Sequence, residues 1–419
     1  MTDRSQGDPG SLFIYWVNQY AVPPDQPGGT RHFDFATELQ RRGHRVRVVA
    51  SDLNLATRNY SRRPGPRDWR AVTEDIRGVR FSWLTAGWYR GNNWRRVASM
   101  VVFGLATFRH LVRVPRDRST VFIGSSPQLF AALGTWAAAR VRRVPFVLEV
   151  RDLWPESYAE VSGKTRGPEI TLMRLVADLL YRQAEAIIVL AAPNTARIIE
   201  RGAHPDRIVV VPNGVDLDGF ATPGDGRDLS APGAFTFVYA GAHGPANGLE
   251  TVVRAAQLLQ EQGRDDIRVV LLGDGASKEE LLELSRKLGL TNIEFVDPVP
   301  KEAVAATLRT ADAGLMILAP VDLFTYGVSP NKLFDYMGVG LPVLTNVAGL
   351  VSDIVADAGV GRTVTPGDAE ALAKGMVAMA DDPPADAAQR GHDFIAEHYH
   401  RRTLAGRVED TLRSLRRRG

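Results

Sequence analysis

Short apolar runs alternate with longer amphipathic stretches along the whole 419-residue chain, and this alternation restricts the fold more than any other feature. Runs that are apolar on both faces and separated by helices predict parallel sheets with helices on both sides. The expected fold class is α/β, with two doubly wound, Rossmann-like domains facing each other across a cleft. The runs cover residues 12–17, 45–50, 120–124, 145–150, 186–190 and 208–211, then 235–240, 268–272, 293–296, 313–318 and 342–345.

Turn-forming residues between positions 215 and 234 indicate a boundary between two domains. We therefore expect an N-terminal domain over residues 1–215 and a C-terminal domain over 216–400. The last helical segment, 401–419, is too basic to be buried outright, and we expect that it can pack back over the first domain.

The net charge of +3 conceals a strong asymmetry along the chain. Residues 1–220 hold 31 basic and 21 acidic side chains, residues 221–400 hold 13 and 25, and residues 401–419 hold 7 and 2. A basic first half suggests an anionic partner, such as a lipid headgroup surface or a phosphorylated acceptor. The arginines and aromatic residues form no recognised nucleic-acid module, so no nucleic-acid partner is expected.

Several classes of protein are disfavoured by what the sequence lacks. The chain has no cysteine, which excludes disulfides, thiolate metal sites and cysteine nucleophiles. Its histidines show no metal-ligand spacing, so no metal site is expected. The first ten residues do not resemble a secretory signal, and no apolar run reaches the roughly 20 residues that cross a bilayer. We expect a cytoplasmic protein.

Two glycine-containing loops stand at matching places in the two halves. Gly28 and Gly29 directly precede a predicted helix, and Gly241 to Gly248 follow the predicted strand 235–240. Glycine lets backbone amides approach an oxyanion, and a helix N-terminus adds partial positive charge. Neither loop has the spacing of a dinucleotide fingerprint or a P-loop, so dinucleotide-dependent oxidoreductases and P-loop NTPases are disfavoured.

The stretch 329–344 reads as a polar loop, a short helix and an apolar strand. Ser329, Pro330 and Asn331 open the helix, and Lys332 and Asp335 lie in its first turns. Backbone amides, one of only six lysines and a carboxylate thus converge at a helix N-terminus, where phosphate and ribose can be held. The alternative is an ordinary helix start.

Together with this stretch, the segments 28–32, 149–156, 211–216 and 272–275 resemble family four of the retaining glycosyltransferases with the GT-B fold. The similarity is greatest to bacterial surface-polysaccharide transferases of the N-acetylfucosamine type. It implies a UDP-sugar bound mainly by the second domain and a glycan or polyprenyl-diphosphate-linked acceptor bound mainly by the first. It also implies transfer with retention, of an N-acetylated or deoxy hexose, without a metal or other cofactor.

The resemblance further implies which residues form the nucleotide-sugar site. Lys332 is the principal cation on the departing diphosphate, since Ala242 and Asn247 stand where many relatives have arginine and lysine. Asp335 accepts hydrogen bonds from ribose, whereas Gly327 replaces the glutamate expected eight positions earlier. The whole set is Gly28, Gly29, Asn213, Gly241, His243, Gly244, Asn247, Gly273, Val296, Val299, Ser329, Pro330, Asn331, Lys332, Leu333 and Asp335.

Catalytic roles are predicted for Lys332 and for Arg151, Asp152 and Glu156, which follow the strand 145–150. A carboxylate at this place can orient or deprotonate an acceptor hydroxyl. Alternatively, Asp152 caps the next helix and pairs with Arg151. Trp154 either stacks on a sugar or fills the core.

The segment 97–112 is apolar, has arginines at both ends and follows Trp83, Trp88, Tyr89 and Trp94. It is typical of a segment at a membrane interface, or equally of a core helix with basic ends. Peripheral attachment to an anionic membrane surface is therefore one of the two expectations for this segment.

Two rivals to a transferase stay open: a nonhydrolysing UDP-sugar 2-epimerase and a noncatalytic nucleotide- or carbohydrate-binding subunit.

Overall fold

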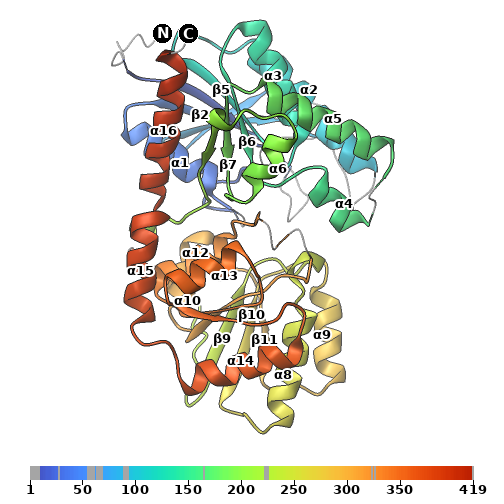
Figure 1. Ribbon diagram of the computed structural model, residues 1–419, viewed down its shortest axis with the longest axis vertical. Coiled ribbons are helices and arrows are strands. Elements are labelled where there is room, and N and C mark those ends of the chain that lie inside the picture. Colours follow the sequence, from blue (N-terminus) through green and yellow to red (C-terminus); the bar gives the residue numbers. More distant parts are fainter. Residues whose placement is uncertain are drawn as a thin grey trace. The chain divides into compact units, whose positions relative to one another are not determined.

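The computed structural model describes residues 10–26, 29–53, 62, 69–87, 94–163, 166–220, 226–321, 324 and 327–417. The chain separates into two compact units, which Figure 1 shows with their elements labelled. Unit 1 comprises Met1–Pro23, Gly28–Pro212 and Arg401–Gly419, and unit 2 comprises Pro24–Pro27 and Asn213–His400. The chain thus passes from unit 1 to unit 2 between Pro212 and Asn213, and it returns after His400.

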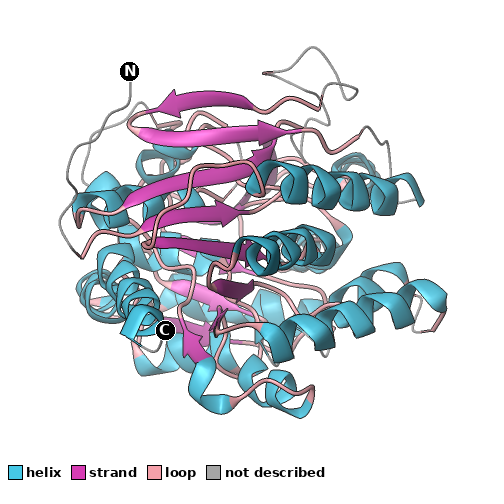
Figure 2. Ribbon diagram, turned by 90° about the horizontal axis from the view of Figure 1, so that it is seen from above, coloured by secondary structure: helices cyan, strands magenta, loops and turns pink. Residues whose placement is uncertain are grey.

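Unit 1 is built on an eight-stranded sheet, and Figure 2 shows its strands lying one above another. The strand order is β3-β4-β2-β1-β5-β6-β7-β8, and only the β3–β4 pair is antiparallel. The strands are β1 (Phe13–Val17), β2 (Arg45–Ser51), β3 (Val72–Ile76), β4 (Val79–Leu84), β5 (Thr120–Ser125), β6 (Phe146–Val150), β7 (Ala186–Val189) and β8 (Ile208–Val210).

Helices cover both faces of this sheet, because its central strands are apolar on both sides. One core lies against α2, α3 and α5, and the other lies against α1 and the C-terminal helix α16. Leu404 and Leu412 of α16 are fully buried, so this arginine-rich helix is amphipathic. The helices are α1 (Arg31–Arg41), α2 (Trp94–Leu111), α3 (Leu129–Arg142), α4 (Glu156–Ser162), α5 (Pro168–Gln183), α6 (Asn194–Glu200) and α16 (Arg401–Arg417).

Unit 2 contains a six-stranded, wholly parallel sheet of order β11-β10-β9-β12-β13-β14. Its strands are β9 (Phe235–Ala240), β10 (Ile267–Leu272), β11 (Ile293–Val296), β12 (Ala313–Met316), β13 (Val343–Thr345) and β14 (Gly361–Thr363). Its helices are α7 (Leu217–Phe220), α8 (Glu250–Glu261), α9 (Lys278–Lys287), α10 (Lys301–Leu308), α12 (Asn331–Val339), α13 (Leu350–Asp357), α14 (Ala369–Asp381) and α15 (Ala387–His398).

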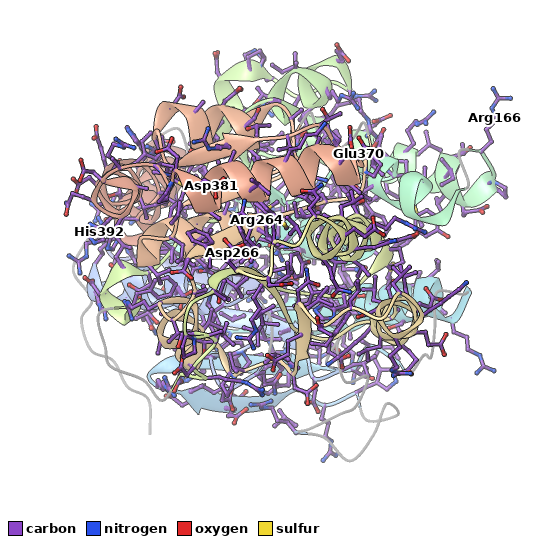
Figure 3. The ribbon with its side chains drawn as sticks, turned by 90° about the horizontal axis from the view of Figure 1, so that it is seen from below. Arg166, Arg264, Asp266, Glu370, Asp381 and His392 are labelled. Carbon is purple, nitrogen blue, oxygen red and sulfur yellow. The ribbon has the colours of Figure 1, made fainter. Side chains whose placement is uncertain are left out.

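Two apolar cores again lie on the two faces of this sheet, one against α8 and α14 and the other against α12 and α13. Arg264 connects the loop between α8 and β10 to the end of α14. Its guanidinium contacts Asp266 at 2.7 Å and Asp381, at the end of α14, at 2.8 Å. Figure 3 labels these three residues. The predicted α/β class with two doubly wound domains is confirmed.

Candidate active site

The sheet of unit 2 has one place where the direction of winding reverses. From β9 the chain proceeds to β10 and β11 on one side, and from β12 it proceeds to β13 and β14 on the other. In open α/β sheets, ligands bind beside the carboxyl ends of the strands at this switch point. The loop after β9 holds Gly241 to Gly248, and the segment after β12 leads to Lys332, so the structure brings these two predicted motifs together.

Lys332 is held by neutral groups. Its Nζ donates a hydrogen bond to Tyr239 Oη at 2.7 Å and another to Asn247 Oδ1 at 3.2 Å, and it lies 4.1 Å from the centre of the Tyr239 ring. Within the described residues, no carboxylate forms an ion pair with it. Desolvation lowers the pKa of this ammonium to about 7. A cation that lacks a counter-ion is suited to an anionic ligand.

Two backbone amides of the loop after β9 have no hydrogen-bond acceptor among the described residues. In the described part of unit 2, neither the Ala242 nor the Gly244 N–H donates to another group. Gly241 has a φ of +156°, and a Cβ there would lie 3.4 Å from the Lys332 Nζ. A side chain at position 241 would be strained and would crowd the lysine, so glycine keeps this part of the site open.

The loops after β9 and β10 are packed directly on one another. A Cβ on Gly275 would lie 2.5 Å from the His243 carbonyl oxygen, and a Cβ on Gly273 would overlap the Gly241 carbonyl. The His243 side chain is fully buried beneath these loops, and desolvation lowers the pKa of its imidazole to about 4. The imidazole is therefore neutral, and neither of its ring nitrogens has a hydrogen-bond partner among the described residues. Contact between His243 and a bound ligand stays a prediction.

Asn213 and Ser329, both predicted site residues, bind each other. The Asn213 backbone N–H donates to Ser329 Oγ at 3.0 Å, and the Asn213 side-chain amide donates to the Ser329 carbonyl. These bonds fix the segment before α12, which begins at Asn331 with Pro330 at the N-cap and no side-chain cap. The amides of the first turn are thus not satisfied by a cap. Leu333 packs its side chain into the core, so only its backbone can face a ligand.

Asp335 lies one turn further along α12, where it is 8% exposed. Its Oδ2 accepts a hydrogen bond at 2.7 Å from Lys301 Nζ, at the start of α10, and its buried Oδ1 has no partner among the described residues. Val296 is fully buried and Val299 packs at the edge of the same core. One carboxylate oxygen therefore stays available for the ribose hydroxyls predicted to bind there, and Lys301 is a neighbour that sequence reasoning missed.

In unit 1, Asp152 and Glu156 have different surroundings. The Asp152 side chain is exposed and forms no ion pair with another described residue, and α4 begins at Glu156 with Pro155 at its N-cap. Asp152 therefore does not cap that helix, and it forms no salt bridge with Arg151 among the described residues. Desolvation raises the pKa of the Asp152 carboxyl, and the nearby Arg151 charge partly opposes this. Glu156, by contrast, is bound at 3.1 Å by the Arg201 guanidinium, which also binds Asp178 at 2.8 Å.

The remaining predictions in unit 1 concern Gly28, Gly29 and Trp154. Gly29 is exposed directly before α1, whereas Gly28 lies outside the described residues. Trp154 is buried in the core beside Tyr158, so the core-filling interpretation is confirmed.

A buried charge network at the carboxyl ends of β1, β5 and β6 escaped sequence reasoning. Glu149 accepts hydrogen bonds from Arg31 Nε at 2.9 Å and from His32 Nε2 at 3.0 Å, and all three side chains are almost wholly buried. Burial raises the pKa of Glu149, but the Arg31 charge and the hydrogen bond from His32 outweigh it, so the pKa lies well below the usual range. Arg31 also donates to the carbonyls of Val211 and Pro212, which ties α1 to the end of unit 1.

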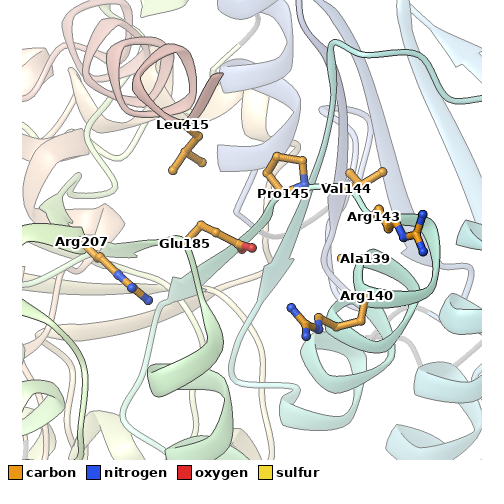
Figure 4. Close-up of a pocket in the computed structure, with 8 residues that line it drawn as sticks. All are labelled: Ala139, Arg140, Arg143, Val144, Pro145, Glu185, Arg207 and Leu415. Carbon is orange, nitrogen blue, oxygen red and sulfur yellow. The ribbon is translucent and has the colours of Figure 1, made fainter. Parts of the chain in front are cut away.

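Two other features lie apart from these motifs. Asp216, Asp218 and His400 place ligand atoms within 4.8 Å of one another, beside the bridge between Val215 and His400. A hollow of about 630 Å³ lies in unit 1 near the amino end of β6, whereas Asp152 follows the carboxyl end of that strand. Its lining is drawn in Figure 4: Ala139, Arg140, Arg143, Val144, Pro145, Glu185, Arg207 and Leu415.

The predicted membrane segment forms most of α2, which has Val101 and Leu105 exposed and Met100 and Phe103 buried. Trp83 is buried and stacks on Phe81, so it cannot contact a membrane. Trp88 and Tyr89 lie outside the described residues, and so does the side chain of Trp94. Among the helices that the structure describes, none combines the length and apolar content needed to cross a bilayer.

Comparison with known proteins agrees with this architecture. Residues 28–214 match the model of the "Glycosyl transferase 4-like domain", and residues 227–395 match that of "Glycosyl transferases group 1". WcaI of Escherichia coli K12, a glycosyl transferase named for colanic acid biosynthesis, is 23% identical over 94% of this chain and 96% of its own length. D-inositol 3-phosphate glycosyltransferase of Kineococcus radiotolerans is 26% identical over 85% of this chain and 77% of its own.

Solved structures show the same fold at low identity. Sucrose-phosphate synthase from Thermosynechococcus elongatus superimposes with a TM-score of 0.77 at 17% identity, over 97% of this chain and 100% of that one. Anabaena HepE in complex with UDP-glucose gives 0.67 at 17% identity, over 96% and 100%. The fold and the two family matches define a glycosyltransferase of the GT-B type. Within that class, the chain belongs to the glycosyltransferases whose halves are the 4-like domain and the group 1 domain.

Proposed function

We propose that the protein is a retaining, metal-independent glycosyltransferase that moves a hexose from a UDP-sugar to a hydroxyl of a glycan acceptor. The observation that carries this proposal is the Lys332 ammonium at the switch point of unit 2, bonded only to the neutral Tyr239 Oη and Asn247 Oδ1 among the described residues. A leaving diphosphate supplies the negative charge that these surroundings lack.

In this reaction the bond between the anomeric carbon and the diphosphate oxygen breaks, and a bond between that carbon and the acceptor oxygen forms. The departing UDP takes the bonding electrons, and Lys332 with the Ala242 and Gly244 amides stabilises the charge that develops on it. The acceptor hydroxyl loses its proton, and the exposed Asp152 is the candidate group that orients or accepts it.

Several observations support the donor and acceptor classes. HepE, which shares the fold, binds UDP-glucose, and WcaI is named for the synthesis of a surface polysaccharide. Unit 1 is the basic part of the chain, which is suited to an anionic acceptor such as a polyprenyl-diphosphate-linked sugar. We therefore propose an N-acetylated or deoxy hexose as the transferred group, a lipid-linked or other glycan acceptor, and peripheral attachment at the inner face of the cell membrane.

The test is mass spectrometry of products from a panel of sugar nucleotides, each offered with lipid-linked and soluble acceptors, with and without EDTA. The proposal expects a glycosylated acceptor and free UDP, with the same yield when EDTA is present. The configuration of the new linkage by NMR checks retention. An epimerised donor formed without any acceptor would indicate a 2-epimerase, and UDP binding without turnover across the panel would indicate a binding subunit.

A further inference from the structure

Most of the exposed large hydrophobic side chains among the described residues belong to one layer of helices in unit 1. Among the described residues six large hydrophobic side chains are exposed, and five of them belong to α2, α3 and α5. Their exposed fractions run from 37% to 65%, and the residues are Val101, Leu105, Val141, Leu172 and Leu175. Exposed apolar residues that occur singly need no explanation, but a collection on neighbouring elements indicates an interaction surface.

These three helices form a single layer over one face of the sheet, and Figure 1 labels them next to one another. The helix α3 packs between the other two and is in close backbone contact with α2, since a Cβ on Gly104 would overlap the Phe130 carbonyl. The apolar side chains that face the sheet are buried in its core, whereas the five exposed ones face away from it. We call this outer side the three-helix surface.

The three-helix surface is basic. Its helices contain seven arginines and only two carboxylates, Glu169 and Asp178, both on α5. Asp178 is bound to Arg201, which reduces the negative charge further. Exposed arginines also stand next to the helices, and Figure 3 shows Arg166, before α5, extending away from the body of the protein.

We propose that the three-helix surface docks on an anionic lipid bilayer. Leucine and valine side chains enter the boundary between headgroups and acyl chains, while the arginines contact lipid phosphates. A second copy of the chain would bring two surfaces of the same positive charge together, which disfavours self-association here. The proposal deepens the proposed function, because a lipid-linked acceptor would lie in the same bilayer. Docking itself requires no turnover.

The test is co-sedimentation of the full chain with vesicles of phosphatidylcholine alone or mixed with phosphatidylglycerol. Binding to the mixed vesicles, weakened by salt, is expected, with little binding to neutral ones. Leu105→Ser/Leu175→Ser should lower the partition coefficient at least about tenfold. The reason is that burial of each whole leucine side chain in the bilayer contributes to the free energy of binding. Arg109→Glu/Arg174→Glu should lower it by a similar factor. Trp69→Ser is the matched control, since Trp69 is the one large hydrophobic residue exposed outside the three helices in the described part of the chain, and this variant should bind as the unchanged protein does.

Circular dichroism and UDP binding of each variant check that the fold is intact, and turnover with a soluble acceptor should be unchanged. Equal binding by all variants, or no binding to either kind of vesicle, overturns the proposal. A dimer that becomes a monomer in Leu105→Ser/Leu175→Ser also overturns it, since the surface would then join two copies. The transferase assignment is separate, because loss of vesicle binding with intact turnover contradicts only the docking surface.

Discussion

Lys332 Nζ lies 2.7 Å from Tyr239 Oη although 93 residues separate the two in the sequence. The two residues belong to α12 and β9, on either side of the switch point of unit 2. Burial raises the pKa of the Tyr239 phenol, so it stays neutral and accepts the hydrogen bond without cancelling the charge of the ammonium. Tyr239 therefore holds Lys332 in position, and the positive charge of the lysine remains available to neutralise an anion.

Replacing Lys332 by alanine should lower kcat with a UDP-sugar by a factor of several hundred. The reason is the loss of one preorganised donor to the leaving group, which typically contributes about 3 to 4 kcal/mol to the transition state. Steady-state kinetics measures the effect. Lys374→Ala, at an exposed lysine of α14 in the same unit, is the matched control and should leave turnover unchanged. Equal rates for both variants would contradict the assigned role.

Binding of a UDP-sugar should weaken as pH rises through about 7. The pKa of Lys332 is lowered from 10.5 to about 7 in the ligand-free protein, so the ammonium is present at lower pH and lost at higher pH. A bound diphosphate favours the charged form and raises this pKa, so binding near pH 7 to 8 should take up a proton. Calorimetry in buffers of different ionisation enthalpy measures that uptake. Lys332→Met should abolish it, and uptake that persists in this variant would assign the proton to another group.

The pair of Asp335 and Lys301 should control recognition of the nucleotide. Asp335→Asn removes the carboxylate predicted to bind ribose, and Lys301→Met releases that carboxylate from its partner. Each single change should raise KM for the UDP-sugar about tenfold with a smaller change in kcat, as for a hydrogen bond to a charged group. In a double-mutant cycle the two effects should not add, because both residues act through one contact. Strict additivity would show that Lys301 acts independently of Asp335.

Asp152 and Glu156 should respond differently to neutralisation. Asp152→Asn removes an exposed carboxylate without an ion pair, so kcat should fall about 100-fold or more while the thermal midpoint stays the same. Glu156→Gln weakens the contact with Arg201 instead, so the midpoint should fall by a few degrees with kcat nearly unchanged. Calorimetry and kinetics on both variants separate the roles. A large loss of kcat confined to Glu156→Gln would reverse the assignment.

Glu149→Gln should destabilise unit 1 by about 3 to 5 kcal/mol, because Arg31 would remain buried without a counter-charge. The pKa of Glu149 is lowered in the folded protein, so its contribution to stability is complete above the ordinary carboxyl pKa of about 4.3 and is lost as pH falls through the folded value. Unfolding of unit 1 should therefore become easier in acid for the unchanged protein and show less pH dependence in the variant. Hydrogen exchange in β1 and β6 reports on this unit. Unchanged protection would contradict the network's structural role.

Most of the fold was predictable because the central strands are continuous apolar runs, as in β9, which was predicted with its observed bounds. The strand β4 was missed although its burial pattern is that of a central strand. The strands β3 and β14 were missed for physical reasons. β3 alternates polar and apolar residues at the sheet edge, where only one face is buried, and β14 has only three residues, Gly361 to Thr363. Patterns of two-sided burial cannot reveal such strands.

At the candidate site, the helix start at Asn331 and the glycine loop after β9 could be found from local sequence. The partners of the charged groups could not, because Tyr239 reaches Lys332, and Lys301 reaches Asp335, only through the tertiary fold. Likewise, burial of His243 depends on Gly273 and Gly275 of a different loop, which no local pattern around His243 indicates.

A crystal structure of the protein with UDP bound would show whether Lys332 holds the diphosphate. We predict the diphosphate at the switch point of unit 2, within hydrogen-bond distance of Lys332 Nζ and of the Ala242 and Gly244 amides. A diphosphate bound elsewhere, with the Lys332 ammonium still held only by Tyr239 and Asn247, would contradict it.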